Sequence, residues 1–112
     1  MDCIFCKIAN GEIPCTKVYE DDRMLAFRDL NPQAPVHVLM IPKQHIASLD
    51  EVSDNNCDVV AHILKNAHII AKQEGLDNGY RIISNCGADA GQTVFHLHFH
   101  LLGGKSLGEN LV

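Results

Sequence analysis

The 112-residue sequence predicts an α+β domain built on an antiparallel sheet of about five strands, with one long helix and one short helix. Strand-like runs precede and follow a single long segment with helical periodicity, and this order of elements is typical of an α+β fold. The length fits one domain over residues 1–112 and leaves no room for a second core.

The first half of the chain is expected to form the short helix and three strands. The helix covers Ile4–Ala9 and is stopped by Asn10 and Gly11. Strand-like runs at residues 16–20 and 24–27 flank a turn at 20–23, whose acidic side chains we interpret as a solvated tip. The run at 36–41 is apolar at nearly every position, so we expect a strand that is covered on both faces.

The second half is expected to hold the long helix and two more strands. Apolar residues recur at helical spacing from Val59 to Ala71, after N-cap candidates at residues 53–56 and before Gly75, a typical helix-ending residue. We interpret His62 and His68, which lie on this helix, as surface or flank residues rather than ligands. The two strands are expected over residues 80–84 and 94–102.

The composition excludes several classes of protein. The net charge is -5 and the nine Lys and Arg residues are scattered, which argues against a general nucleic-acid binder. Residues 1–6 lack a basic leader, and no apolar run approaches the roughly 20 residues that a membrane helix needs. We therefore expect a cytoplasmic protein whose five cysteines are thiols or metal ligands, and we interpret Cys15, Cys57 and Cys86 as ordinary small residues.

The most informative segment contains three of the seven histidines within five residues, at His96, His98 and His100. Side chains alternate across a strand, so these histidines are expected on one face, with imidazoles roughly 7 Å apart. The alternate residues would form the core face of this strand, and they are Phe95, Leu97, Phe99 and Leu101.

Three interpretations of this segment differ in chemistry. The histidines could have gathered on the strand without a function, or they could chelate one metal ion. In the third interpretation a neutral imidazole attacks an electrophile while a neighbouring group fixes its tautomer. The flanking residues favour the third, because they supply exposed N–H groups, an amide and a hydroxyl that can hold phosphate oxygens; they are Gly87, Gly91, Gln92 and Thr93.

The sequence resembles the histidine triad (HIT) family. The alternation His96-Leu97-His98-Phe99-His100-Leu101-Leu102 matches the family pattern. Further matching segments cover nearly the whole chain: Ile13-Pro14, Tyr19-Glu20-Asp21-Asp22, Asn31-Pro32-Gln33-Ala34-Pro35-Val36-His37, Ile41-Pro42-Lys43-Gln44-His45, Gly79-Tyr80-Arg81 and Gly103-Gly104. The chain is most similar to the Hint branch, whose members are purine nucleoside phosphoramidases and nucleotide hydrolases.

The resemblance implies a role for each matching position. The catalytic residues would be His98 as the nucleophile, His100 and His37 as the groups that orient and polarise, and His96 as the first residue of the triad. Asn85, Gln92 and Thr93, with the backbone near Gly91, would contact the α-phosphate and the leaving group. Asp29 would bind the ribose hydroxyls. The purine slot would be lined by Ile4, Phe5, Ile8, Ile13, Phe27 and Leu30.

Several of these positions also have an ordinary structural explanation. From spacing alone, Ile4, Phe5 and Ile8 are typical core residues, and His37 is a buried strand histidine bonded to some neighbour. Asp29 could simply begin a turn. The tail at residues 105–112 lacks the aromatic ending of animal Hint proteins, and Thr93 replaces the more common Ser.

Cys3 and Cys6 form a C-x-x-C pair, the spacing at which two thiolates bind one zinc ion. Resemblance to some bacterial family members implies that His45 and His96 complete this site. We expect such a zinc ion to be structural and remote from the phosphate, and we expect catalysis to require no cofactor.

The resemblance implies an enzyme that cleaves purine nucleoside phosphoramidates or related AMP conjugates through a nucleotidyl-histidine intermediate. The alternatives are a metal-dependent hydrolase that uses the histidine cluster and a nucleotide-binding regulatory scaffold. The resemblance also implies a homodimer, built by the helix near residues 59–74 and the strand near residues 80–84. No nucleic-acid or membrane partner is expected.

Overall fold

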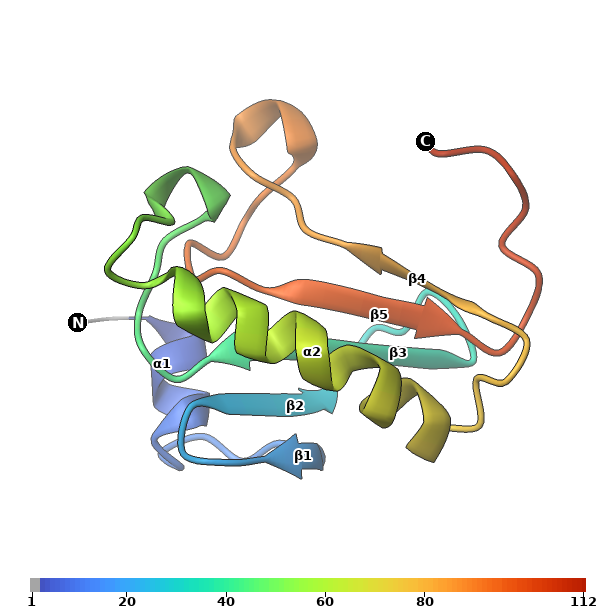
Figure 1. The fold of residues 1–112 in the computed structure, drawn as a ribbon, viewed down its shortest axis with the longest axis horizontal. Helices are drawn as coiled ribbons and strands as arrows, with labels where there is room; N and C mark the ends of the chain where they lie inside the picture. The colour runs from blue at the N-terminus through green and yellow to red at the C-terminus, as the bar shows by residue number, and fades with distance from the viewer. Residues whose placement is uncertain (1–2) are drawn as a thin grey trace.

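A computed structural model describes residues 3–112 and confirms the predicted α+β fold (Figure 1). Met1 and Asp2, which the expectation about a leader includes, lie outside the described residues. Over residues 3–112, two α-helices, two short 3-10 helices and a five-stranded antiparallel sheet make up the fold. Between residues 3 and 112, no helix is both long and apolar enough to cross a membrane.

The sheet has the strand order β1-β2-β3-β5-β4, and every neighbouring pair is antiparallel. The strands are β1 Lys17–Glu20, β2 Met24–Arg28, β3 Val36–Pro42, β4 Tyr80–Ile83 and β5 Phe99–Gly103. The position of β3 between β2 and β5 explains its composition, because every residue from His37 to Pro42 is buried. The prediction of a strand covered on both faces is therefore confirmed.

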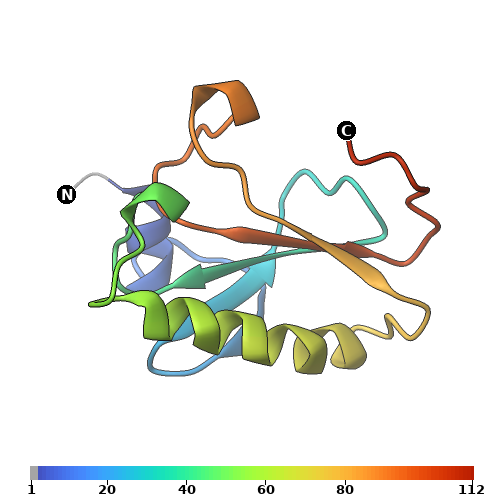
Figure 2. The same cartoon turned by 45° about the horizontal axis from the view of Figure 1, so that its top comes forward.

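The long helix α2, Cys57–Gln73, covers one face of the sheet (Figures 1 and 2). It begins after Asn56, and Gly75 adopts a left-handed conformation with φ of 77° just past its end, as the sequence predicts. Its apolar side packs on alternate strand residues in the larger core, which includes Met24, Ala26, Val38, Met40, Ile63, Ile70, Phe99 and Leu101.

The short helix α1, Ile4–Ala9, packs in a second apolar cluster formed by the alternate residues of β2 and β3. This cluster contains Cys3, Phe5, Ile8, Leu25, Phe27, Leu39 and Ile41. Because side chains alternate along a strand, the cluster lies on the sheet face opposite α2. The loop between β2 and β3 and the loop with the 3-10 helix η2, Ala88–Ala90, also rise on the side away from α2 (Figure 2).

The last strand begins later than the sequence predicts. We expected a strand over residues 94–102, but β5 begins at Phe99 and residues 94–98 are not paired in the sheet. The alternation therefore fails upstream: Phe95, expected in the core, is 59% exposed, whereas His96 is fully buried. The expected register also placed all three histidines away from the core, yet His98 is 9% exposed.

The acidic turn between β1 and β2 is more than a solvated tip. The Asp21 carboxylate accepts hydrogen bonds from the Tyr19 hydroxyl and from Nε2–H of His62 on α2, both at 2.7 Å, and from the N–H groups of Arg23 and Met24. Burial raises the pKa of Asp21, but these hydrogen bonds outweigh it and hold the pKa well below its ordinary value. His62 therefore connects α2 to the hairpin through its hydrogen bond to Asp21.

We expect Asp21→Ala to lower the free energy of unfolding by about 1.5–3 kcal/mol, because it removes a charged acceptor from four donors at once. Chemical denaturation monitored by circular dichroism measures this change. Asp22→Ala is the matched control, since Asp22 is the exposed neighbour in the same turn. Equal effects of the two substitutions would contradict a stabilising role for the hydrogen bonds to Asp21.

Candidate functional site

His37 on β3 and His100 on β5 meet on the sheet face opposite α2. In the antiparallel register His37 pairs with Leu102 and Leu39 pairs with His100, so the two histidines are diagonal neighbours on one face. Nε2 of His37 lies 2.8 Å from Nδ1 of His100, and the ring centroids are 5.1 Å apart. The register of the two central strands therefore builds this pair.

The hydrogen bonds around this pair fix the tautomers of the neutral rings. The backbone N–H of Gln33 donates to Nδ1 of His37 at 3.0 Å, so the proton of His37 is on Nε2. That Nε2–H donates to Nδ1 of His100, which leaves the proton of His100 on its own Nε2. His100 therefore presents an N–H donor at the end of a chain of hydrogen bonds that begins at a backbone amide.

His98 carries its proton on the other ring nitrogen from His37 and His100. Its Nδ1 lies 2.7 Å from the carbonyl oxygen of His96, and a carbonyl can only accept, so Nδ1 carries the proton. Nε2 then keeps a free lone pair. The His98 ring contacts the His100 ring at a centroid distance of 5.1 Å and 69°. A ring with a free nitrogen lone pair thus lies beside a ring that carries an N–H donor.

Burial keeps the histidine pair neutral. Burial, with smaller contributions from the neighbouring His98 and His37, lowers the pKa of His100 to about 4, although the Asp29 carboxylate opposes the shift. Burial also lowers the pKa of His37, again against the carboxylate of Asp29, whose Oδ2 lies 3.5 Å from Nε2 of His37. Both rings are therefore uncharged near neutral pH, as the tautomer assignment requires.

His96 belongs to a different group of side chains from the other two triad histidines. Its Nδ1 lies 3.3 Å from Sγ of Cys3 and 3.5 Å from Sγ of Cys6, and Cys6 lies 3.3 Å from Nδ1 of His45. All four ligand atoms lie within 4.8 Å of one another. We call these four residues the Cys/His cluster; they are the four that the family resemblance implies as zinc ligands.

The Cys/His cluster fits a tetrahedral zinc ion. With bond lengths of about 2.3 Å to sulfur and about 2.0–2.1 Å to nitrogen, neighbouring sulfur and nitrogen ligands are about 3.6 Å apart. The three observed separations are 3.3, 3.3 and 3.5 Å. Nε2–H of His96 donates to the carbonyl of Pro42 at 2.7 Å, which leaves Nδ1 free to bind a metal. Burial and the adjacent Cys3 raise the pKa of the Cys6 thiol, which favours its protonated form, whereas a bound cation would favour the thiolate.

The loop between β4 and β5 is shaped by Gln92. Its side-chain oxygen accepts from the N–H of Gly87, and its Nε2 donates to the carbonyls of Ala47 and Val94. Gln92 is buried, so its amide holds the loop rather than facing solvent as a phosphate contact would. Of the other residues expected at the phosphate, Gly91 and Thr93 are exposed and Asn85 is half-buried.

The apolar residues expected around the purine occupy two kinds of position. Phe5, Ile8 and Phe27 are buried in the cluster under α1, with Ile13 packed against them. By contrast, Leu30 is 99% exposed and Ile4 is 49% exposed.

Asp29 both begins a turn and faces the histidines. Its Oδ1 accepts from the N–H of Asn31 at 2.8 Å, which is the turn role considered in the sequence analysis. Its Oδ2 approaches His37, and the ligand atoms of Asp29, His37 and His100 lie within 4.8 Å of one another. The two roles use different oxygens of one carboxylate.

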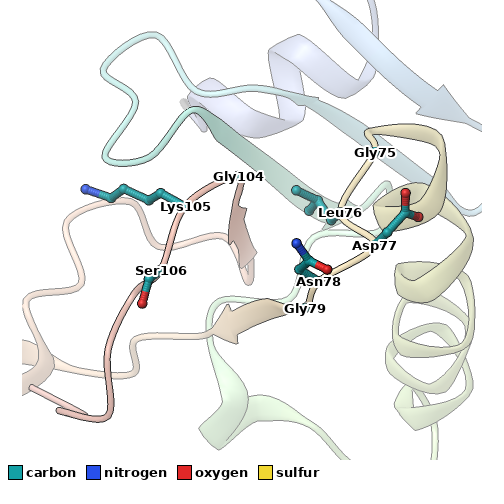
Figure 3. Close-up of a pocket in the computed structure, with 8 residues that line it drawn as sticks. All are labelled: Gly75, Leu76, Asp77, Asn78, Gly79, Gly104, Lys105 and Ser106. Atoms are coloured by element: carbon teal, nitrogen blue, oxygen red, sulfur yellow. The ribbon is translucent and has the colours of Figure 1, made fainter.

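A cavity of about 630 Å³ lies elsewhere, between the α2–β4 loop and the segment after β5 (Figure 3). It is lined by Gly75, Leu76, Asp77, Asn78, Gly79, Gly104, Lys105 and Ser106. None of these residues is a histidine or was expected in the site, so this cavity is separate from the histidines.

Two supporting contacts were not anticipated. The Gln33 N–H that fixes the His37 tautomer is a backbone group, and backbone groups have no signature in a sequence. Ser84, at the end of β4, donates its hydroxyl to the carbonyl of His98 at 2.8 Å. A serine after a strand is too common to have indicated this contact.

The antiparallel sheet, the paired histidines and the free lone pair on Nε2 of His98 define a histidine triad protein, and comparisons with known proteins agree. A family model described as scavenger mRNA decapping enzyme C-term binding matches residues 2–110. A solved HIT family hydrolase from Clostridium thermocellum superposes with a TM-score of 0.96 at 51% identity, covering 99% of this chain and 97% of that one.

Two plant relatives show the same similarity over most of the chain. The 14 kDa zinc-binding protein of Brassica juncea is 48% identical over 95% of this chain and 96% of its own length. Adenylylsulfatase HINT1 of Arabidopsis thaliana is 46% identical over 93% of this chain and 72% of its own length. The chain belongs to the histidine triad family, and within it the chain is Hint-like.

We expect the ring signals of His100 to titrate with a midpoint near pH 4 in NMR spectra, rather than near the ordinary value of 6.5. Between these two values the folded state binds fewer protons than the unfolded state, so the free energy of unfolding falls as the pH is lowered through this range. Spectra of His100→Gln identify the signals. A midpoint at or above pH 6.5 would contradict a buried, neutral His100.

Proposed function

We propose that this protein is a hydrolase that cleaves purine nucleoside phosphoramidates or related AMP conjugates, with His98 as the nucleophile. The observation that supports it most is the 2.7 Å contact of His98 Nδ1 with a backbone carbonyl, which leaves Nε2 free to attack. The Arabidopsis relative named adenylylsulfatase and the solved HIT family hydrolase support hydrolysis of a nucleotide conjugate.

The reaction would proceed in two displacements at the α-phosphorus. In the first, Nε2 of His98 forms a bond to phosphorus, the bond from phosphorus to the amine nitrogen breaks, and the leaving amine takes up a proton from solvent. In the second, water attacks phosphorus and gives up a proton to solvent, the bond to Nε2 breaks, and the nucleoside monophosphate is released. Splitting one hard displacement into two easier ones is the advantage of a covalent intermediate.

The neighbouring residues would supply charge and protons. The Nε2–H of His100 can donate to a phosphate oxygen or to the leaving group, and His37 fixes its tautomer from behind. Thr93, Asn85 and the backbone at Gly91 would hold the non-bridging oxygens. Gln92 would act by shaping their loop, since its amide is already engaged by three backbone groups.

The metal-dependent alternative is less well supported. The three triad histidines do not converge on one point, because Nδ1 of His96 faces Cys3 and Cys6 while Nδ1 of His98 faces a carbonyl. Among residues 3–112, the two groups of side chains that could hold a metal ion are the Cys/His cluster and Asp29–His37–His100, and neither contains the whole triad.

We propose that the Cys/His cluster binds zinc. Its donor distances fit a tetrahedral ion, and the Brassica relative is named a zinc-binding protein. Zinc held by four protein ligands would stabilise the packing of α1 on the sheet and would have no open position for a substrate.

We expect His98→Ala to lower turnover of an AMP–amine conjugate by at least ~10³-fold, because it removes the covalent route. AMP binding should survive. The matched control is His68→Ala, an exposed histidine on α2, and it should leave turnover unchanged. Near-normal turnover by His98→Ala would exclude His98 as the nucleophile, and AMP binding without turnover in the wild type would indicate a scaffold instead.

We propose that Asp29 binds the ribose hydroxyls through Oδ2. Asp29→Asn should weaken AMP binding by about 1–3 kcal/mol, because a charged acceptor is replaced by a neutral amide. The asparagine can keep the Oδ1 bond to the N–H of Asn31, so the turn should persist. Calorimetric titration with AMP measures the change, with the exposed Asp50→Asn as control. Unchanged affinity would leave Asp29 as a turn residue only.

We also propose a homodimer formed by α2 and β4. β4 is an edge strand, and Tyr80 on β4 and Leu64 on α2 are 41% and 46% exposed. Light scattering at micromolar concentration should give the mass of a dimer, and Leu64→Glu should shift it towards monomer. Leu49→Glu, at a similarly exposed residue outside α2 and β4, should have no effect. A wild-type protein that is monomeric at this concentration would contradict the proposal.

A further inference from the structure

We propose that the Cys/His cluster positions the nucleophile, so that a metal bound there sets the tautomer and orientation of His98. The inference rests on the proposed function, because it assigns the cluster a role in the same reaction. It gives a zinc ion that is expected to be remote from the phosphate an indirect role in the reaction. Two separate contacts connect the cluster to the His98 ring.

The first contact runs through the main chain of His96. The side chain of His96 is fully buried and is held at both ring nitrogens, by the cysteines at Nδ1 and by the Pro42 carbonyl at Nε2. The carbonyl of the same residue accepts the Nδ1–H of His98. Fixing the His96 side chain therefore fixes the acceptor that determines which nitrogen of His98 is free.

The second contact runs through α1. Phe5 lies between Cys3 and Cys6 in the sequence, and its ring meets the His98 ring edge-on at a centroid distance of 5.1 Å and 85°. A helix of six residues is too short to be stable by itself. Its first turn is held through the cluster, because the sulfur of Cys3 accepts the N–H of Cys6 at the N-terminus. Binding a metal at these thiols would therefore hold Phe5 against His98.

The segment that contains His98 lacks the strand pairing that holds the rest of the site. Residues 94–98 precede β5 and make no sheet pairing. Leu97 donates its N–H to the carbonyl of Ile46 at 2.6 Å, and Ile46 follows the cluster residue His45. Ser84 holds the carbonyl of His98 from the other side. Gln92 also donates to the carbonyl of Val94, and Leu97 is buried in the larger core, so the restraints from the cluster act together with these contacts.

The test reads the tautomer of His98 directly. Purified wild-type protein should contain about one zinc per chain, and ¹⁵N NMR at pH 8 should show His98 as a single Nδ1–H tautomer. In Cys6→Ser and in His45→Ala, each stripped of metal, a mixture of tautomers should appear. The kcat for an AMP–amine conjugate should fall by about 10- to 100-fold. His45→Ala leaves α1 and its thiols intact, so the test survives if Cys6→Ser fails to fold.

A control separates positioning from general loss of stability. Ile63→Val removes one methylene from the core under α2, on the opposite face of the sheet, and should lower the midpoint of thermal unfolding without mixing the His98 tautomers. A purely structural cluster would behave like this control.

Two results would overturn the inference. One is a folded, metal-free cluster variant that keeps a single Nδ1–H tautomer and a kcat within about twofold of wild type. The other is wild-type protein without zinc whose His98 signals do not change when zinc is added. The tautomer is read without substrate, so absence of turnover in the wild type, which would contradict the proposed function, is a distinguishable outcome.

Discussion

The hydrogen bond between Nδ1 of His98 and the carbonyl of His96 determines the chemistry available to the site. An imidazole has two nitrogens, and only the one without a proton can attack an electrophile. Because a carbonyl oxygen can only accept, this bond places the proton on Nδ1 and the lone pair on Nε2. The same reasoning, applied to the hydrogen bonds from Gln33 to His37 and from His37 to His100, places the proton of His100 on Nε2.

The two faces of the sheet carry different features, because one holds the larger core and the other holds the histidine pair. The larger core lies under α2, where alternate residues of β2, β3 and β5 pack against the buried side of the helix. The other face holds α1 and the histidine pair of β3 and β5. A shift of one residue in the β3–β5 register would move His37 and His100 to opposite faces, so the same backbone pairing maintains both the core and the site.

Much of the fold could be predicted because its signals are local. The helical periodicity of residues 59–71, the stop at Asn10 and Gly11, and the apolar run of β3 each depend on neighbouring residues. The error at residues 94–98 had a long-range cause. Strand alternation predicts Phe95 inside and His96 outside, but contacts with Cys3, 93 residues away, and with Pro42 draw His96 inward.

The candidate site was predictable to a different extent for each residue. The four members of the Cys/His cluster follow from the family resemblance, and the structure brings them together. Gln92 was expected at the phosphate, but its amide is bonded to backbone groups of Gly87, Ala47 and Val94. These contacts depend on how the chain folds, so the sequence does not indicate them. Gln33 contributes through its backbone N–H, a group that every residue except proline has. The sequence therefore could not indicate this contact.

The most direct measurement of the central claim is capture of the covalent intermediate. The protein is mixed with an AMP–amine conjugate, quenched within milliseconds, digested and mapped by mass spectrometry. The account predicts a nucleotidyl group on the peptide that contains residues 96–100, attached to His98. An adduct on another residue, or release of amine from the conjugate with no adduct at any quench time, would contradict it.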